Sequence, residues 1–309
     1  NACATATDAF RNACYAVAAG IYDIALAVGV EKLKDSGYSG LAIPESPGAD
    51  VNPPTPPPAQ FAMAATRYFH QYGIPYEDGK RTLAQIAQKN HHNGSLNPRA
   101  HFQREISVEQ VVDAPMIAWP LGLFDCCGVS DGGAAAIITT PEIAKSFRQD
   151  YILVKGLGLS VGAFGMIRDD WDFTHFPESV HASQAAYQEA GISDPLQDID
   201  LAMVHDCFTI TELIIYEDLG FSSRGNASRD VEQGTFSLEG DLPVNTDGGL
   251  KCFGHPIGAS GIRMIYEVYK QLQGKAERRQ LQKADIGLTH NLGGRPGSFT
   301  CSVGIFGRA

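Results

Sequence analysis

The sequence predicts an α/β fold with a mixed, largely parallel sheet. Short apolar runs typical of strands alternate with helical patterns, and the second half of the chain repeats the first half in outline. The strand patterns cover residues 24–30, 151–159 and 199–205. The clearest helical patterns cover residues 180–190 and the stretch that follows Pro256. This alternation favours helices packed on sheets.

The first elements follow from local patterns. Residues 4–19 place Phe10, Cys14 and Val17 on one helical face, and Gly20 ends that pattern. Residues 24–30 form a continuous apolar run that ends at Glu31. Such a run is typical of a strand buried on both faces of a sheet.

A proline-rich stretch then opens an insertion. Residues 44–58 contain seven prolines, which exclude regular structure and predict an exposed loop. Helical patterns follow at residues 60–72 and 76–90, and the chain returns to a core strand at residues 131–139.

The second half ends in a helix and a hairpin. Thr209 and Glu212 are spaced as a capping box for a helix over 209–219, and Gly220 is placed to end it. The helix after Pro256 is expected to reach Leu272. The closing hairpin pairs residues 286–290 with 299–306 across the turn at 293–297.

Composition excludes several classes of protein. With 309 residues and 44% hydrophobic content the chain can bury a large core, and no apolar stretch approaches the roughly 18 residues of a membrane span. The net charge of -11 argues against a nucleic-acid-binding surface. Residues 61–104 nevertheless hold six basic residues against two acidic ones, so this region is either a phosphate-binding surface or an ordinary solvated face. The basic residues there are Arg67, Lys80, Arg81, Lys89, Arg99 and Arg104.

The seven cysteines indicate reduced thiols. Their number is odd, and their spacing matches neither a zinc site nor a Cys-x-x-Cys pair, so no metal centre is predicted. Cys126 and Cys127 lie beside an alanine-rich run and are expected in the core, as are Cys14 and Cys252.

Four residues stand where catalytic groups are expected. His255 lies in the turn Gly-His-Pro-Ile-Gly-Ala-Ser-Gly, where Pro256 suits the first position of a helix. His205 and His290 each stand at the end of an apolar run that predicts a strand. Cys3 precedes a helix, where unpaired N–H groups favour a thiolate. From the residues alone, a buried inert thiol is favoured for Cys3, and the histidines could be structural.

These motifs occur in the order and spacing of one known family. The chain resembles the thiolase superfamily, and within it the sterol-carrier-protein-2 type, because His-Asp-Cys-Phe stands where classical thiolases have Asn-Glu-Ala-Phe. The resemblance implies a five-layered α-β-α-β-α fold with two similar halves and an inserted loop domain. It places an N-terminal half at residues 1–43 and 126–150, the loop domain at 44–125 and a C-terminal half at 151–309.

The resemblance also implies roles for individual residues. Cys3 would be the nucleophile, with its backbone N–H in an oxyanion hole. His255 would be its base, and His205 would hold a water that, with His255, stabilises a thioester enolate. His-Asn-Leu-Gly-Gly replaces the family's second reactive cysteine, so Cys207, or more weakly His290, would be the second acid/base. The remaining implied contacts are Gly293 and Gly294 at the oxyanion hole, and Arg67, Lys80, Arg81 and Ser260 around coenzyme A.

The expected function is an acyl-CoA C-acyltransferase that cleaves 3-ketoacyl-CoA or runs the reverse condensation. Hydroxymethylglutaryl-CoA synthase or ketoacyl synthase chemistry, or a non-catalytic subunit of a complex, are the alternatives. We expect coenzyme A as substrate, no permanently bound cofactor, a homodimer or tetramer with a partner protein as a further option, and a cytoplasmic location. Only two residues precede Cys3, so the family's N-terminal strands are expected either in a further segment or from a neighbouring chain.

Overall fold

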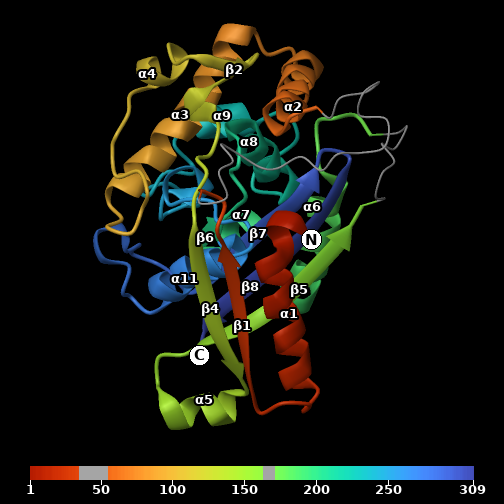
Figure 1. The fold of residues 1–309 in the computed structure, drawn as a ribbon, viewed down its shortest axis with the longest axis vertical. Helices are drawn as coiled ribbons and strands as arrows, with labels where there is room; N and C mark the ends of the chain where they lie inside the picture. Colours follow the sequence, from red (N-terminus) through yellow and green to blue (C-terminus); the bar gives the residue numbers. More distant parts are fainter. Residues whose placement is uncertain (35–54, 163–170) are drawn as a thin grey trace.

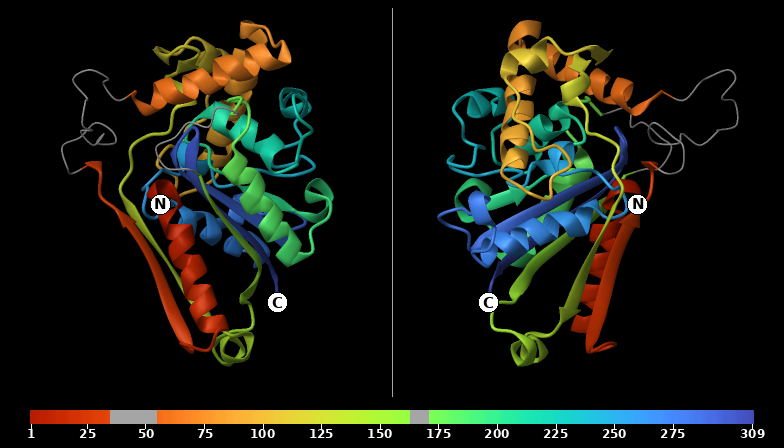
Figure 2. Two further views of the ribbon diagram at one scale, coloured as in Figure 1. Left: turned by 90° about the vertical axis from the view of Figure 1, so that its right-hand side faces the viewer. Right: turned by 60° about the vertical axis from the view of Figure 1, so that its left-hand side comes forward.

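The computed structural model describes residues 1–34, 55–162 and 171–309. Their core is arranged in four layers, visible edge-on in Figure 2. A two-stranded sheet is followed by a helical layer, a four-stranded sheet and a second helical layer. These are four of the five layers that the sequence resemblance implies.

The smaller sheet pairs β1 (Ile24–Glu31) with β4 (Gly132–Thr139) in antiparallel register, from Ile24 opposite Thr139 to Glu31 opposite Gly132. Only one face of β1 is covered by described residues. Ala27 is buried, whereas Leu26 and Val30 are 63% and 70% exposed. The expectation of a strand buried on both faces is therefore not met here.

The larger sheet has the order β5-β8-β7-β6. Its strands are β5 (Ile152–Val161), β6 (Leu201–Met203), β7 (Ile286–Arg295) and β8 (Ser298–Arg308). β8 runs antiparallel to both β5 and β7, and only β6 with β7 is parallel. The prediction of a largely parallel sheet is wrong, because the tight β7–β8 turn and the β5 pairing impose antiparallel neighbours.

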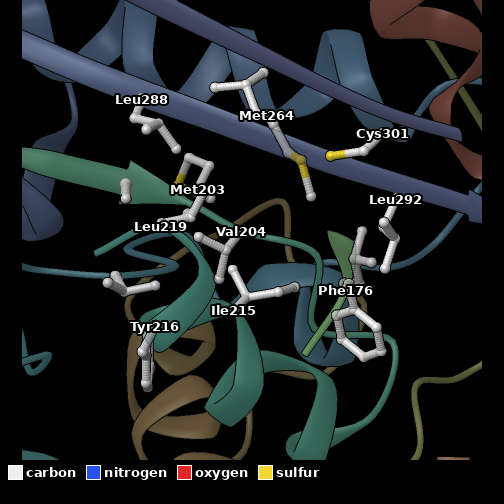
Figure 3. Close-up of a cluster of buried hydrophobic side chains, with 14 of the residues drawn as sticks. Phe176, Met203, Val204, Ile215, Tyr216, Leu219, Met264, Leu288, Leu292 and Cys301 are labelled. Atoms are coloured by element: carbon white, nitrogen blue, oxygen red, sulfur yellow. The ribbon is translucent and has the colours of Figure 1, made fainter. Parts of the chain in front are cut away.

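Helices cover both faces of the larger sheet. α1 (Thr5–Ala18), preceded by the 3₁₀ turn η1 (Ala2–Ala4), lies with α11 (Ser260–Leu272) between the two sheets (Figure 1). On the other face lie α6 (Pro177–Ala190), the short α7 (Pro195–Asp198) and α8 (Thr209–Asp218). α6 packs tightly on β5, since a Cβ at Gly156 would meet the α6 backbone. Figure 3 shows the apolar side chains that fill this side, among them Phe176, Ile215 and Leu292.

The segment from residue 57 to residue 125 forms the upper end of the molecule in Figure 1. It contains α2 (Pro57–Tyr72), α3 (Tyr76–Ser95), α4 (Val108–Val112), β2 (Met116–Ala118), β3 (Leu121–Gly122) and η3 (Leu123–Asp125). Most of the proline-rich stretch lies outside the described residues. Pro57 and Pro58, however, begin α2, where the missing N–H of proline costs nothing.

The remaining short elements are α5 (Pro141–Phe147), α9 (Ala227–Glu232), α10 (Gly249–Cys252) and η4 (Glu277–Arg279). None of the described helices is both long and apolar enough to cross a bilayer.

Candidate active site

Three residues far apart in the sequence meet at one point. Cys3 lies in η1, His205 follows β6, and His255 lies in the turn before α11. One potential ligand atom from each side chain, the Cys3 sulfur and a ring nitrogen of each histidine, lies within 4.8 Å of the other two. The two imidazole rings meet edge to face, with centroids 5.3 Å apart. Cys3 is half-buried and both histidines are buried.

The turn at residues 255–259 holds His255 through Ser260. The sequence predicted that Pro256 begins the helix, but α11 starts at Ser260. The N–H groups of Ala259 and Ser260 instead donate to the Pro256 carbonyl in a turn that precedes the helix. The Ser260 hydroxyl donates to that carbonyl at 3.0 Å and lies 2.7 Å from His255 Nδ1. Since its proton is used there, the hydroxyl accepts from Nδ1–H. The Nε2 atom of His255 therefore carries the lone pair of a base.

His205 has the opposite hydrogen-bond arrangement. The side-chain amide of Asn291, on β7, donates to His205 Nδ1 at 3.2 Å. An imidazole that accepts at Nδ1 carries its proton on Nε2, so His205 presents a donor. Asn291 was not predicted as a site residue. The only sequence signal was its place directly after His290.

Burial favours the uncharged form of all three groups. Burial raises the pKa of the Cys3 thiol to about 12 and lowers the pKa of His255 to about 3. Burial, with the neighbouring His255 and His290, also lowers the pKa of His205 well below its usual value. This shift opposes the thiolate expected at the helix N-terminus, because desolvation outweighs the favourable backbone contacts.

His290 points away from this centre. Neighbouring residues of a strand face opposite sides of the sheet, and Asn291 faces His205. His290 instead lies on the α6 side, with its Nε2 2.9 Å from the Ser179 hydroxyl. The structure therefore does not bring His290 together with Cys3.

Cys207 lies beside the centre with Cys127. The Cys127 N–H donates to the Cys207 carbonyl at 2.9 Å, and the Cys207 sulfur is 3.7 Å from the Thr211 hydroxyl. Burial raises the pKa of the Cys207 thiol well above its usual value, and proximity to Cys127 and Cys3 adds to this effect. Three thiols thus share one region, although the sequence assigned Cys127 only to the core.

Asp206 connects the His205 segment to the turn that carries His255. Its buried carboxylate accepts from the Leu250 and Lys251 N–H groups of α10 at 2.6 and 3.2 Å, and from the Asn90 amide at 2.9 Å. Burial and the nearby Glu212 raise the pKa of Asp206 to about 7. Since α10 ends only three residues before His255, this carboxylate fixes the approach to the turn.

The capping box predicted at the start of α8 does not form. The residue before the helix is Phe208, and Thr209 donates to Asp125 at 2.8 Å. Glu212 accepts from the side-chain amides of Asn90 and Asn245, at 2.6 and 3.1 Å. Both supposed capping residues are used in buried tertiary contacts. Gly220, with φ of +75°, does follow the helix end as predicted.

The four residues predicted to contact coenzyme A differ in exposure to solvent. Arg67 reaches the Asp172 carbonyl at 3.2 Å, and Arg81 is 59% exposed near Glu109. Lys80 is 3% exposed and paired with the buried Asp125. Ser260 is buried against His255. Lys80 and Ser260 therefore do not lie on a surface open to the phosphates of coenzyme A.

Two glycines lie near the end of β7, and Gly293 makes room for the segment that carries Cys3. A Cβ at Gly293 would lie 2.8 Å from the Cys3 nitrogen and would also meet the Asn1 carbonyl. Gly294 has φ of +117°, which other residues rarely adopt. Gly293 thus allows the segment that carries Cys3 to pack directly on β7, whereas a Cβ at Gly294 would meet Ser298 and Phe299 of β8.

Comparisons with known proteins agree with this geometry. Residues 164–305 match the family of thiolase C-terminal domain-like sequences. Acetyl-CoA acetyltransferase of Methanothermobacter thermautotrophicus is 40% identical over 99% of this chain and 78% of its own length. Human sterol carrier protein 2 is 30% identical over 95% of this chain, which spans 55% of that protein.

A solved structure titled Ltp2-ChsH2(DUF35) aldolase superposes with a TM-score of 0.82 at 28% identity, over 98% of this chain and 77% of that one. The four layers, the sequence matches and the His-Asp-Cys-Phe motif lead to one assignment. The chain belongs to the thiolase superfamily.

Proposed function

We propose that this protein is an acyl-CoA C-acyltransferase of the thiolase type, which works through an acyl group on Cys3. The observation that carries the proposal is the meeting of the Cys3 sulfur with one ring nitrogen of His205 and one of His255, all within 4.8 Å. One histidine presents a base and the other a donor. A thiol, a base and a donor are the groups that acyl transfer from a thioester needs.

In the first half-reaction His255 Nε2 takes the Cys3 proton while the sulfur attacks the thioester carbon. The carbon–sulfur bond to coenzyme A then breaks, and the leaving thiolate recovers the proton from His255. Burial raises the pKa of Cys3 to about 12 and lowers that of His255 to about 3, which disfavours an ion pair between them in the free enzyme. Proton transfer must accompany the attack on the substrate.

In the second half-reaction an acyl-CoA loses an α-proton and its carbon attacks the acyl group on Cys3. The negative charge of the enolate gathers on the thioester oxygen, where the His205 Nε2–H donates directly or through a water. We assign removal of the α-proton to Cys207, because its sulfur shares the region of Cys3 while His290 faces α6. The Cys207 thiol first gives its own proton to His255 Nε2 and then takes the α-proton as a thiolate, and His255 passes the proton it received to the departing Cys3 thiolate. Run backwards, the same steps cleave a 3-ketoacyl-CoA with coenzyme A.

Coenzyme A is in this proposal a substrate, and no permanent cofactor is required by these steps. The exposed Arg67 and Arg81 remain our candidates for its phosphates. We further propose the domain division implied by the sequence, with residues 44–125 forming the loop domain over the site. Gly293 and Gly294 are proposed as support for the oxyanion hole.

A partner-dependent carbon–carbon lyase is the second candidate. It is favoured by the close superposition on a structure whose title names an aldolase and a DUF35 component. In that case a partner protein would complete the active assembly, and Cys3 need not carry an acyl group.

Mass spectrometry of the protein after incubation with acetyl-CoA separates the two candidates. A mass gain of one acetyl group on the Cys3 peptide, removed by hydroxylamine as expected for a thioester, supports the acyltransferase. Cys14→Ser serves as the matched control, because Cys14 is a half-buried thiol of α1 outside the site. Turnover of a 3-ketoacyl-CoA by Cys3→Ser at the wild-type rate would refute the acyl-enzyme mechanism.

A further inference from the structure

The active-site cluster has the composition of a transition-metal site. One sulfur and two imidazole nitrogens come within 4.8 Å of one another. Bonds of about 2.0–2.3 Å from Zn²⁺ to such atoms place tetrahedral ligands roughly 3.3–3.8 Å apart, so small side-chain movements would close the set. Among the described residues no other group of three such ligands meets this criterion.

The surroundings of the two histidines are those of metal ligands. A ligating histidine usually has its other ring nitrogen fixed by a hydrogen bond, and here both Nδ1 atoms are engaged, by Ser260 and by Asn291. His255 already presents a free lone pair on Nε2. His205 would exchange its ring proton from Nε2 to Nδ1, and Asn291 can serve that tautomer because its Oδ1 is buried without a partner. Rotation of the amide would turn this oxygen toward Nδ1–H.

We propose that Cys3, His205 and His255 bind one Zn²⁺ ion in competition with acyl transfer. Binding converts the Cys3 thiol to a zinc-bound thiolate and releases its proton to solvent, while both imidazoles bind in the neutral form. Thiolate and imidazole ligands together favour zinc over magnesium or calcium. Three protein ligands leave the fourth position open to water or to a substrate thiol. The bound ion removes the nucleophile, so zinc acts as a reversible inhibitor.

The inhibition rests on the proposed acyltransferase function, whereas zinc binding does not and is measured directly. The reduced, metal-free protein is titrated with Zn²⁺ against a chromophoric chelator, and with Co²⁺ as a spectroscopic probe. We expect one ion per chain and a thiolate-to-cobalt charge-transfer band with the intense visible bands of a tetrahedral site. Binding should tighten as pH rises, since a proton is released.

Variants assign the ligands. Cys3→Ser should abolish the charge-transfer band. His205→Asn should weaken zinc binding roughly 10-fold or more, because loss of a hydrogen-bond partner of a metal ligand already costs about that much and loss of the ligand itself should cost at least as much. His92→Asn is the matched control, because His92 is an exposed histidine paired with Glu105 at 3.0 Å. Circular dichroism verifies that each variant is folded.

Cys3 protection gives an independent measurement. Zinc should slow alkylation of the Cys3 peptide and leave the Cys14 peptide unaffected. An unchanged zinc affinity in Cys3→Ser, a cobalt spectrum without a thiolate band, or equal protection of both cysteines would each overturn the proposal.

Discussion

Replacing Ser260 by alanine tests how the catalytic base is held. The Ser260 hydroxyl accepts from His255 Nδ1–H and donates to the Pro256 carbonyl, and both groups are buried. In Ser260→Ala the Nδ1–H loses its acceptor, and an unsatisfied buried donor costs about 1–3 kcal/mol. If that cost raises the activation free energy of acylation, because His255 loses its orientation and tautomer, the acylation rate falls about 5- to 150-fold. This conversion uses roughly 1.4 kcal/mol per factor of ten in rate.

Ser183→Ala is the matched control for this change. Ser183 is equally buried, and its hydroxyl donates to the Val180 carbonyl at 3.0 Å within α6. It lies on the far side of the larger sheet from His255. Both variants should lose about 0.5–3 kcal/mol of unfolding free energy, but only Ser260→Ala should lose activity.

The assay is steady-state thiolysis of acetoacetyl-CoA together with pre-steady-state acylation of Cys3. We expect kcat to fall while KM for coenzyme A stays within about twofold, because the change removes no contact with substrate. Ser260→Thr, which keeps the hydroxyl, should recover part of the rate. A raised KM with unchanged kcat would refute this reasoning and would restore the earlier prediction that Ser260 binds coenzyme A.

Three further predictions concern the other groups of the site. Cys207→Ala should keep acylation of Cys3 but lose α-proton exchange of acetyl-CoA, measured by NMR in deuterated water, whereas His290→Gln should keep both; the reverse result would reassign the acid/base. Asp206→Asn should lower the unfolding free energy by about 1–3 kcal/mol and slow acylation, because one donor of α10 then faces an amide NH₂; chemical denaturation and the acylation rate measure the two effects, and an unchanged acylation rate would contradict the link to His255. Because the pKa of Cys3 is about 12, its alkylation by iodoacetamide should accelerate about tenfold per pH unit from pH 6 to 9; a plateau near neutral pH would indicate a preformed thiolate.

Local sequence patterns predicted where helices and strands lie better than they predicted how each element is buried and paired. The closing hairpin, the helix that ends at Leu272 and the strand at 24–31 all form close to where periodicity placed them. The strand at 24–31 is nevertheless exposed on one face, and the larger sheet is mostly antiparallel. An apolar run reports that a segment can be buried, but strand direction and the covering of each face depend on segments far away in the sequence.

The same limit applies to the site. The motifs around Cys3, His205 and His255 identified the residues that meet, because a resemblance carries their order and spacing along the chain. The surplus of basic residues at 61–104 predicted Lys80 on a phosphate-binding surface, but Lys80 pairs with the buried Asp125, 45 positions away in the sequence. Charge counting could not reveal Asn291 either, since the role of an amide depends on the side of the strand that it faces.

The partners on Nδ1, rather than charge, distinguish the two catalytic histidines. Burial lowers the pKa of both imidazoles, so the direction of the shift does not tell acid from base. Ser260 has already used its own proton and can only accept, whereas the amide nitrogen of Asn291 can only donate. His255 is therefore left with a lone pair toward the thiol and His205 with a proton. Two neutral side chains of one type thus acquire opposite functions from a hydroxyl and an amide, which is why substitutions at these two partners should alter the chemistry without contacting the substrate.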